Sequence, residues 1–187
     1  MERKTKRHWL NEALKALGES GAAALTVEVL TTRLSVTKGS FYYHFKSYAD
    51  FKEKLLQFYE EESTYHIIRI AEEAGPPEEK LQKLLELTIQ SRPQVEVAFR
   101  AWALQDGEVR IYQARMDLQR MSYLQKLCQD LGQSETEALV MARLLYTIFV
   151  GSQQVIPPIQ DEERKQLYRQ IQQAVSKPAK FLAAEKE

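Results

Sequence analysis

The stretch Leu34–Ser47, LSVTKGSFYYHFKS, constrains the fold of this chain more than any other. The residues before it, Val27–Leu34, carry apolar side chains at helical spacing. Thr37 then stands where the N-cap residue of a second helix is expected. The pattern predicts two short helices joined by a tight turn, a helix-turn-helix, whose second helix can enter the major groove of DNA.

The second predicted helix, Thr37–Phe45, begins with small and polar residues and continues with aromatic ones. Small residues let the backbone come close to DNA, and polar side chains supply donors for phosphates and base edges. Phe41 and Phe45 are four residues apart and are expected to lie in the core. Tyr42 and Tyr43 then point away from that stripe and toward DNA, because adjacent helical residues are about 100° apart.

The segment VTKGSFYYHFKS resembles the recognition helix of TetR-type (TetR/AcrR) bacterial transcription regulators. In that family a hydroxyl residue, Lys, Gly, Ser or Thr and an aromatic residue precede Tyr-x-His-Phe. This chain has Ser35 where the family's turn usually carries Gly, and Thr31 where Ala is usual. Ser35 therefore has to adopt a positive φ or the turn has to be rebuilt, at a cost of about 1 kcal/mol.

The candidate DNA-binding residues are the small, hydroxyl-bearing, aromatic and cationic residues of this region. For His44 two readings stay open, a contact of the ring N–H with phosphate or a hydrogen bond to local carbonyls. The basic residues of the N-terminal segment either add phosphate contacts as a flexible segment or form a solvated, frayed N-terminus. The predicted DNA-binding set is Thr26, Thr37, Lys38, Gly39, Ser40, Tyr42, Tyr43, His44 and Lys46, and the basic segment is Arg3, Lys4, Lys6 and Arg7.

The charge distribution supports one end of the chain as the nucleic-acid-binding end, although the net charge is zero. Residues 1–47 contain 8 Lys and Arg against 4 Asp and Glu, a balance of +4, and the remainder contains 18 against 22, a balance of −4. A basic N-terminal region on an acidic body suits a protein that presents one end to DNA.

Periodicity and helix-stop signals predict an all-α fold of about nine helices. Three short helices form an N-terminal helix-turn-helix head, residues 1–47, and residues 48–187 form a helical effector-binding and dimerisation body. A long helix from Ser47 to about Ala74 joins the two parts, and the tail FLAAEKE is expected to be disordered. The predicted helices are 3–19, 27–34, 37–45, 47–74, 78–91, 94–106, 108–131, 135–153 and 161–174.

The helix predicted over 135–153 contains ALVMARLLYTIFVG, which is apolar on nearly all sides. Such a helix has to be covered on more than one side. A second copy of the chain is the natural cover. This helix and the helix over 161–174 are then expected to form half of an intermolecular four-helix bundle. The alternative is a monomer in which this helix is central and fully buried. The TetR resemblance, in which the last two major helices dimerise, favours the homodimer.

Aromatic and apolar residues of the body are candidates for an effector cavity, because the family keeps an apolar pocket there with a few polar side chains. Each of them is equally an ordinary core residue, and each polar member equally belongs to a solvated face. The predicted ligand-binding set is His66, Phe99, Arg100, Trp102, Tyr112, Met116, Tyr123 and Phe149.

No residue pattern indicates catalysis, and no cofactor or metal is predicted. The three histidines have no ligand partner at zinc-like spacing, and the sequence has no phosphate loop or nucleophile elbow. Cys128 is interpreted as a small buried hydrophobe, with a redox-sensing thiol as the alternative. The longest near-apolar run, Ala138–Gly151, is too short to cross a bilayer, so a cytoplasmic protein is expected.

The sequence therefore predicts a homodimeric, ligand-responsive regulator, expected to be a repressor, that binds a palindromic operator in double-stranded DNA and responds to an unidentified small molecule. A helical dimer that binds a small molecule or a protein without specific DNA recognition is the alternative. A DNA-binding protein without an effector is a third possibility.

Overall fold

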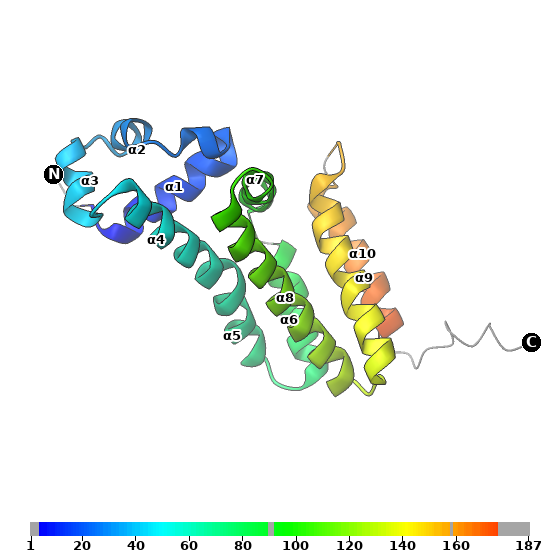
Figure 1. The fold of residues 1–187 in the computed structure, drawn as a ribbon. Helices are drawn as coiled ribbons and strands as arrows, with labels where there is room; N and C mark the ends of the chain where they lie inside the picture. Colours follow the sequence, from blue (N-terminus) through cyan, green and yellow to red (C-terminus); the bar gives the residue numbers. More distant parts are fainter. Residues whose placement is uncertain (1–3, 90–91, 158, 176–187) are drawn as a thin grey trace, which may run out of the picture. The chain divides into compact units, whose positions relative to one another are not determined.

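The computed structural model describes residues 4–89, 92–157 and 159–175, and every regular element within them is a helix (Figure 1). The predicted all-helical fold is confirmed. The helices are α1 (Lys6–Ser20), a 3₁₀ turn (Ala22–Ala24), α2 (Val27–Leu34), α3 (Lys38–His44), α4 (Tyr48–Glu60), a π-helical turn (Glu61–Tyr65), α5 (His66–Glu72), α6 (Pro77–Ile89), α7 (Pro93–Ala103), α8 (Gly107–Asp130), α9 (Glu135–Gln154) and α10 (Asp161–Val175).

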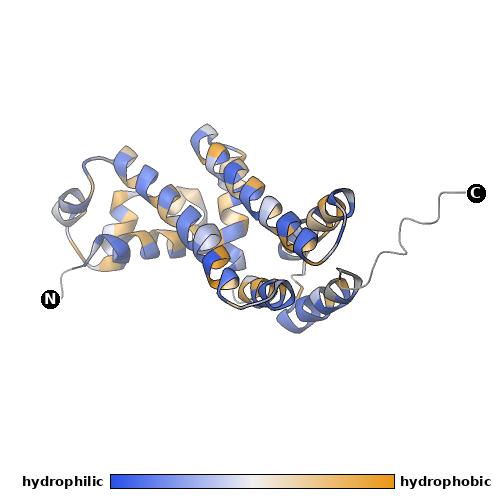
Figure 2. Cartoon of the chain, turned by 90° about the horizontal axis from the view of Figure 1, so that it is seen from below, coloured by the Kyte–Doolittle hydropathy of each residue, from blue (hydrophilic) through white to orange (hydrophobic). Residues whose placement is uncertain are grey.

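The described residues pack into two compact units. Unit 1 comprises residues 4–63 and 92–116, and unit 2 comprises residues 64–89, 117–157 and 159–175. The predicted division at residue 47/48 concerns the roles of the two parts of the chain, and it stays a prediction. The helices carry hydrophobic and hydrophilic residues side by side along their length (Figure 2), as expected for elements that each bury one face.

The core of unit 1 is built from α1, the helix-turn-helix, α4 and α7. Trp9 is fully buried and meets Phe41 edge-on, with ring centroids 5.5 Å apart. Phe51 of α4 packs on the same cluster, 5.4 Å from Phe41. Phe41 and Phe45 are buried in this core as predicted, together with Leu10, Leu14, Leu17, Leu25 and Leu30, and Leu34 is half-buried.

Two residues of the basic N-terminal segment, Lys6 and Arg7, belong to the first turn of α1, and Lys4 precedes the helix. Thr5 caps the helix, because its hydroxyl accepts the N–H of His8 and its own N–H donates to Nδ1 of His8 at 3.0 Å. Arg7 is paired with Glu62 at 3.0 Å. The prediction of a flexible segment is therefore wrong for Lys6 and Arg7, whereas Arg3 lies outside the described residues, as does the tail predicted to be disordered.

The predicted long helix is present as α4, the π-helical turn and α5, which follow one another from Tyr48 to Glu72. Ser47 caps its start by accepting the N–H of Asp50 at 3.1 Å. The Asp50 carboxylate in turn accepts the N–H of Lys46 at 2.9 Å. Among the described residues, no helix is both long enough and apolar enough to cross a membrane.

The core of unit 2 is formed by α5, α6, the second half of α8, α9 and α10. Cys128 is fully buried in it, and burial raises the pKa of its thiol to about 11. A thiol with that pKa carries almost no thiolate near neutral pH, so the structure supports the buried hydrophobe and argues against the redox sensor.

Candidate nucleic-acid interface

The turn between α2 and α3 has a left-handed residue, the first of the two alternatives that the sequence left open. Ser35 adopts φ 55° and ψ 46°, the conformation that usually selects Gly. Its N–H and that of Val36 donate to the carbonyls of Thr32 and Thr31, at 3.1 and 3.0 Å. The two helices are therefore joined by a tight turn as predicted, with Ser bearing the conformational cost.

Thr31 replaces the expected Ala without leaving a buried polar group unpaired. Its side chain is buried, and its hydroxyl donates to the carbonyls of Val27 at 2.8 Å and Glu28 at 2.9 Å. A helical Thr that bonds back to the preceding turn hides its polarity inside its own helix. Thr26 caps α2 by accepting the N–H of Val29 at 3.2 Å.

The aromatic residues of α3 are divided between the core and the surface as the sequence predicted. Phe41 and Phe45 have 0% and 1% of their surface exposed, whereas Tyr42 and Tyr43 have 57% and 67%. Tyr42 still touches Phe41 edge-on, with ring centroids 5.3 Å apart, which steadies its position at the surface. The result is a pair of exposed phenols on a rigid support.

Hydroxyl groups surround a hollow of about 500 Å³ at the helix-turn-helix. Thr37 occupies the N-cap position of α3, although its side chain makes no capping hydrogen bond. The remaining lining comes from the end of α2, the turn and the first turn of α3, namely Thr31, Thr32, Ser35, Val36 and Ser40.

Gly39 is exposed, and nothing in the described chain requires a glycine there. A Cβ added at this position meets only Oγ1 of Thr37, at 3.6 Å, which is ordinary contact. Its backbone is helical, so the protein's own packing gives no reason for the absence of a side chain. A close-approaching partner gives one, since a missing Cβ lets backbone and ligand come nearer.

The basic residues in and beside α3 differ in their exposure and in their partners. Lys38 is exposed and forms an ion pair with Glu28 of α2. Lys46 is exposed, and its backbone N–H donates to Asp50. His44 is half-buried, with its ring 5.0 Å from that of Tyr43 and 6.4 Å from that of Trp9. The ion pair between Glu28 and Lys38 was not predicted from the sequence, because no helical spacing links residues in two different helices.

The nine predicted DNA-binding residues thus all belong to α2, α3 and their flanks in unit 1, and most are exposed. Only Ser40 and His44 are half-buried among Thr26, Thr37, Lys38, Gly39, Ser40, Tyr42, Tyr43, His44 and Lys46. Their role in DNA binding stays a prediction.

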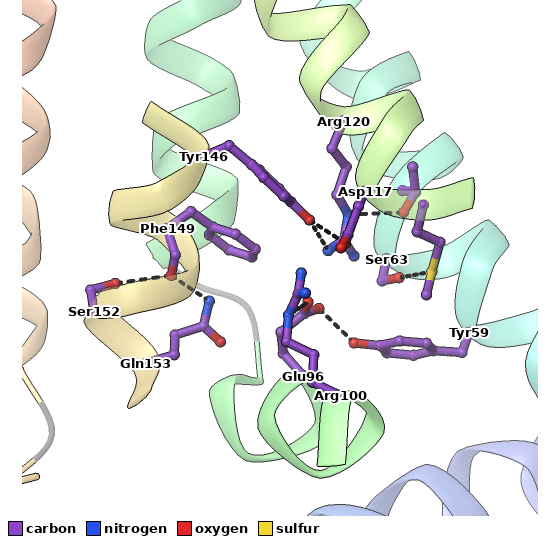
Figure 3. Close-up of polar contacts among 12 residues, drawn as sticks. Tyr59, Ser63, Glu96, Arg100, Asp117, Arg120, Tyr146, Phe149, Ser152 and Gln153 are labelled. Carbon is purple, nitrogen blue, oxygen red and sulfur yellow. Dashed lines mark hydrogen bonds and ion pairs between the residues drawn. The ribbon is translucent and has the colours of Figure 1, made fainter. Parts of the chain in front are cut away.

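The predicted ligand-binding residues are divided between the units. In unit 1, Phe99 is fully buried and stacks on Tyr59 with centroids 4.3 Å apart, and the Tyr59 hydroxyl donates to the buried Glu96 at 2.7 Å (Figure 3). Arg100 pairs with the same carboxylate at 3.0 Å. Unit 1 also holds Trp102, Tyr112 and Met116 of this set, and unit 2 holds His66, Tyr123 and Phe149.

In unit 2 a second polar cluster lies on α8 and α9. The Tyr146 hydroxyl donates to Asp117 at 2.6 Å (Figure 3). Arg120 donates to the Thr64 hydroxyl at 3.0 Å, and its guanidinium lies 5.7 Å from the ring centroid of Phe149. Of the predicted set, His66 is exposed and Tyr123 is buried, and burial raises the pKa of the Tyr123 phenol.

The helix α9 buries one side and exposes an apolar other side. Ala138, Ala142 and Leu145 are buried in the core of unit 2, whereas Val140 and Leu144, four residues apart, have 50% and 47% of their surface exposed. Further exposed apolar side chains in and after this helix, and in α10, are Leu139, Val155, Ile156 and Leu167.

These elements define a helix-turn-helix protein, in which α2, the turn and α3 form the motif. The second unit is also built from helices. Residues 10–57 match the family model described as "Bacterial regulatory proteins, tetR family", so the predicted resemblance is confirmed over this part of the chain.

Solved structures share the fold over most of the chain. A transcriptional regulator (TerR/AcrR family) from Aquifex aeolicus VF5 is 22% identical with a TM-score of 0.65, and the match covers 92% of this chain and 98% of that one. A transcriptional regulator from Rhodococcus sp. Rha1 is 17% identical with a TM-score of 0.62, covering 94% and 100%. A comparison with curated protein sequences finds no match.

Proposed function

We propose that this chain is a transcriptional regulator that binds a palindromic operator in double-stranded DNA as a homodimer and represses transcription until a small molecule binds. The main support for DNA binding is that α3 has one buried face and one exposed face. Phe41 and Phe45 anchor the helix, while Tyr42, Tyr43 and Lys38 stand exposed beside a glycine that the fold does not need.

The contacts fall into two kinds. Lys46, Tyr42 and His44 supply donors for phosphates, which position the protein on the duplex. The first turn of α3, with Thr37, Lys38 and Ser40, and Tyr43 beyond it, reads base edges in the major groove. The exposed hydroxyls, phenols and ammonium groups support this assignment, since each is a donor that phosphate and base oxygens accept.

The exposed apolar face of α9 supports the homodimer. Val140 and Leu144 lie next to each other on one face of the helix and are exposed to water. A second copy of the chain, related by a two-fold axis, would cover them with the same face of its own α9. Two heads related by such an axis would enter successive major grooves about 34–36 Å apart, which predicts a palindromic site.

The continuous helical segment from Tyr48 to Glu72 supports the response to a small molecule. It carries a π-helical turn at Glu61–Tyr65, a local departure that recurs at functional positions in helices. Glu60, just before this turn, is buried and forms a bidentate pair with Arg115 of α8, at 2.5 and 2.6 Å. An effector that binds one arrangement of these helices more tightly would shift the separation of the heads and hence the affinity for DNA.

DNA binding is tested by titrating fluorescent duplexes, random and palindromic, at several salt concentrations. Wild type is expected to bind with an affinity that falls steeply with salt, and Lys38→Ala is expected to lose about tenfold or more on the palindromic duplex that wild type binds most tightly. Lys126→Ala, which removes an exposed lysine in unit 2, is the matched control and is expected to bind as wild type does. Absence of salt-dependent binding would favour a helical module that binds a small molecule or a protein instead.

A further inference from the structure

Across the turn of the helix-turn-helix, two oppositely charged side chains are held together at the surface. Glu28 lies in the first turn of α2 and Lys38 begins α3, and their carboxylate and ammonium groups form an ion pair. Both side chains are exposed, 64% and 61% respectively, so DNA has access to both. The pairing holds the pKa of Glu28 below and that of Lys38 above its usual value, chiefly through the hydrogen bond between them.

The pair competes directly with DNA for the same ammonium group. Phosphate oxygens are anionic acceptors of the same kind as a carboxylate. The other carboxylates at this end of unit 1 are already engaged elsewhere, since Glu12 and Glu19 bind Arg33 at 2.7 and 2.8 Å and Asp50 accepts the N–H of Lys46. Glu28 is thus the described carboxylate that sets whether Lys38 is available.

We propose that Glu28 is a specificity-determining residue, which withholds Lys38 from the phosphates of non-specific DNA and releases it only where Lys38 reaches base-edge acceptors. This inference rests on the proposed DNA-binding function. On a non-specific duplex, one more phosphate contact by Lys38 requires that the pair with Glu28 be broken. At a matching site the ammonium gains acceptors of a guanine edge, which offset the loss of the carboxylate.

Neutralising Glu28 should therefore raise affinity for all DNA and raise it most for the wrong DNA. In Glu28→Gln the freed Lys38 gains a phosphate contact on non-specific duplexes, so their affinity is expected to rise about tenfold at low salt. The log–log salt dependence is expected to steepen by about 0.9 for each head. Affinity for a selected operator already includes the Lys38 contact and is expected to rise only about two- to threefold.

The experiment compares wild type, Glu28→Gln and Glu53→Gln by anisotropy titration of a random duplex and a selected operator. Glu53 is an exposed carboxylate of α4 with no contact to Lys38 in the structure, so its substitution controls for the change in net charge. The same Glu28→Gln change is also made in a Lys38→Gln background, where it is expected to lose most of its effect. Thermal unfolding checks that the variants are folded.

Three results decide between the explanations. A steeper salt dependence and a lower operator-to-random ratio, in Glu28→Gln alone, would support the proposal. Equal effects of Glu28→Gln and Glu53→Gln, or an undiminished effect without Lys38, would overturn it while leaving DNA binding in place. A wild-type protein that binds no duplex at all would overturn the proposed function and this inference together.

Discussion

Both α3 and α9 expose large side chains to a similar extent, but the exposed side chains differ in their chemistry. Tyr42 and Tyr43 in α3 end in hydroxyl groups, whereas Val140 and Leu144 in α9 end in methyl groups. A phenol offers an apolar ring and a hydrogen-bond donor, which suits a charged, wet partner such as DNA. Methyl groups offer only area to bury, which suits a second protein surface. Exposure alone therefore does not indicate the class of partner; the end of the side chain does.

The two helices also differ in how they are supported. Behind the exposed tyrosines, Phe41 packs among large aromatic rings, with Trp9 and Phe51 both within about 5.5 Å between centroids. Behind the exposed face of α9, small residues such as Ala138 and Ala142 are buried. A rigid aromatic support fixes the direction of a few specific donors, and small buried residues let helices pack closely.

The largest effect is expected from placing a charge on the apolar face of α9. Leu144→Glu would bury two unpaired carboxylates at a two-fold interface and is expected to weaken dimerisation by about 100-fold or more. Sedimentation equilibrium measures this. Leu118→Glu, an equally drastic change at an exposed leucine of α8, is the control and is expected to leave the dimer intact. Cys128 should stay unreactive to alkylation in both variants, which shows that the core of unit 2 is preserved. A Leu144→Glu protein that dimerises as wild type does would remove α9 from the interface.

A medium effect is expected from removing only the hydroxyl groups of α3. Tyr42→Phe with Tyr43→Phe keeps the rings and is expected to reduce affinity for DNA by about 30-fold, taking about 0.5 kcal/mol, the low end of the usual range, for each of four hydrogen bonds lost in two heads. Tyr48→Phe is the matched control, since Tyr48 is an exposed tyrosine of α4 outside the predicted set. If all three substitutions had the same effect, the phenols of α3 would have no special part in binding.

A smaller effect, with opposite signs for stability and binding, is expected at Gly39. Because a Cβ has room in the free protein, Gly39→Ala is expected to stabilise the fold by about 0.5–1 kcal/mol through helix propensity. The same methyl group is expected to weaken DNA binding by about tenfold, because it stands where the duplex approaches. Thermal unfolding and anisotropy titration measure the two changes. A destabilised protein, or unchanged affinity, would contradict this role of the glycine.

The sequence alone predicted the parts of the molecule that are determined locally. The four-residue spacing of Phe41 and Phe45 was enough to place Tyr42 and Tyr43 on the surface, and the exposed fractions confirm it. The turn at Ser35 was also predictable, although the sequence left open whether Ser35 takes a positive φ or the turn is rebuilt, and the structure shows the positive φ.

The parts that depend on contacts between distant segments were not predictable. The π-helical turn Glu61–Tyr65 contains no Gly or Pro, and its residues bond instead to a helix more than 50 residues away: Ser63 to the sulfur of Met116 at 3.7 Å and Thr64 to Arg120 at 3.0 Å. The pairs Glu28–Lys38 and Tyr59–Glu96 are likewise set by packing and have no periodic signal in the sequence.

The most direct test of the central claim is to select DNA from a random pool with the wild-type protein and to measure how many chains bind each recovered duplex. Because the proposed dimer holds two copies of α3 through one α9 interface, we expect an inverted repeat with half-site centres about 10–10.5 base pairs apart, bound by chains in multiples of two. A pool that shows no enrichment, or a recovered site without symmetry that is saturated by a single chain, would contradict it.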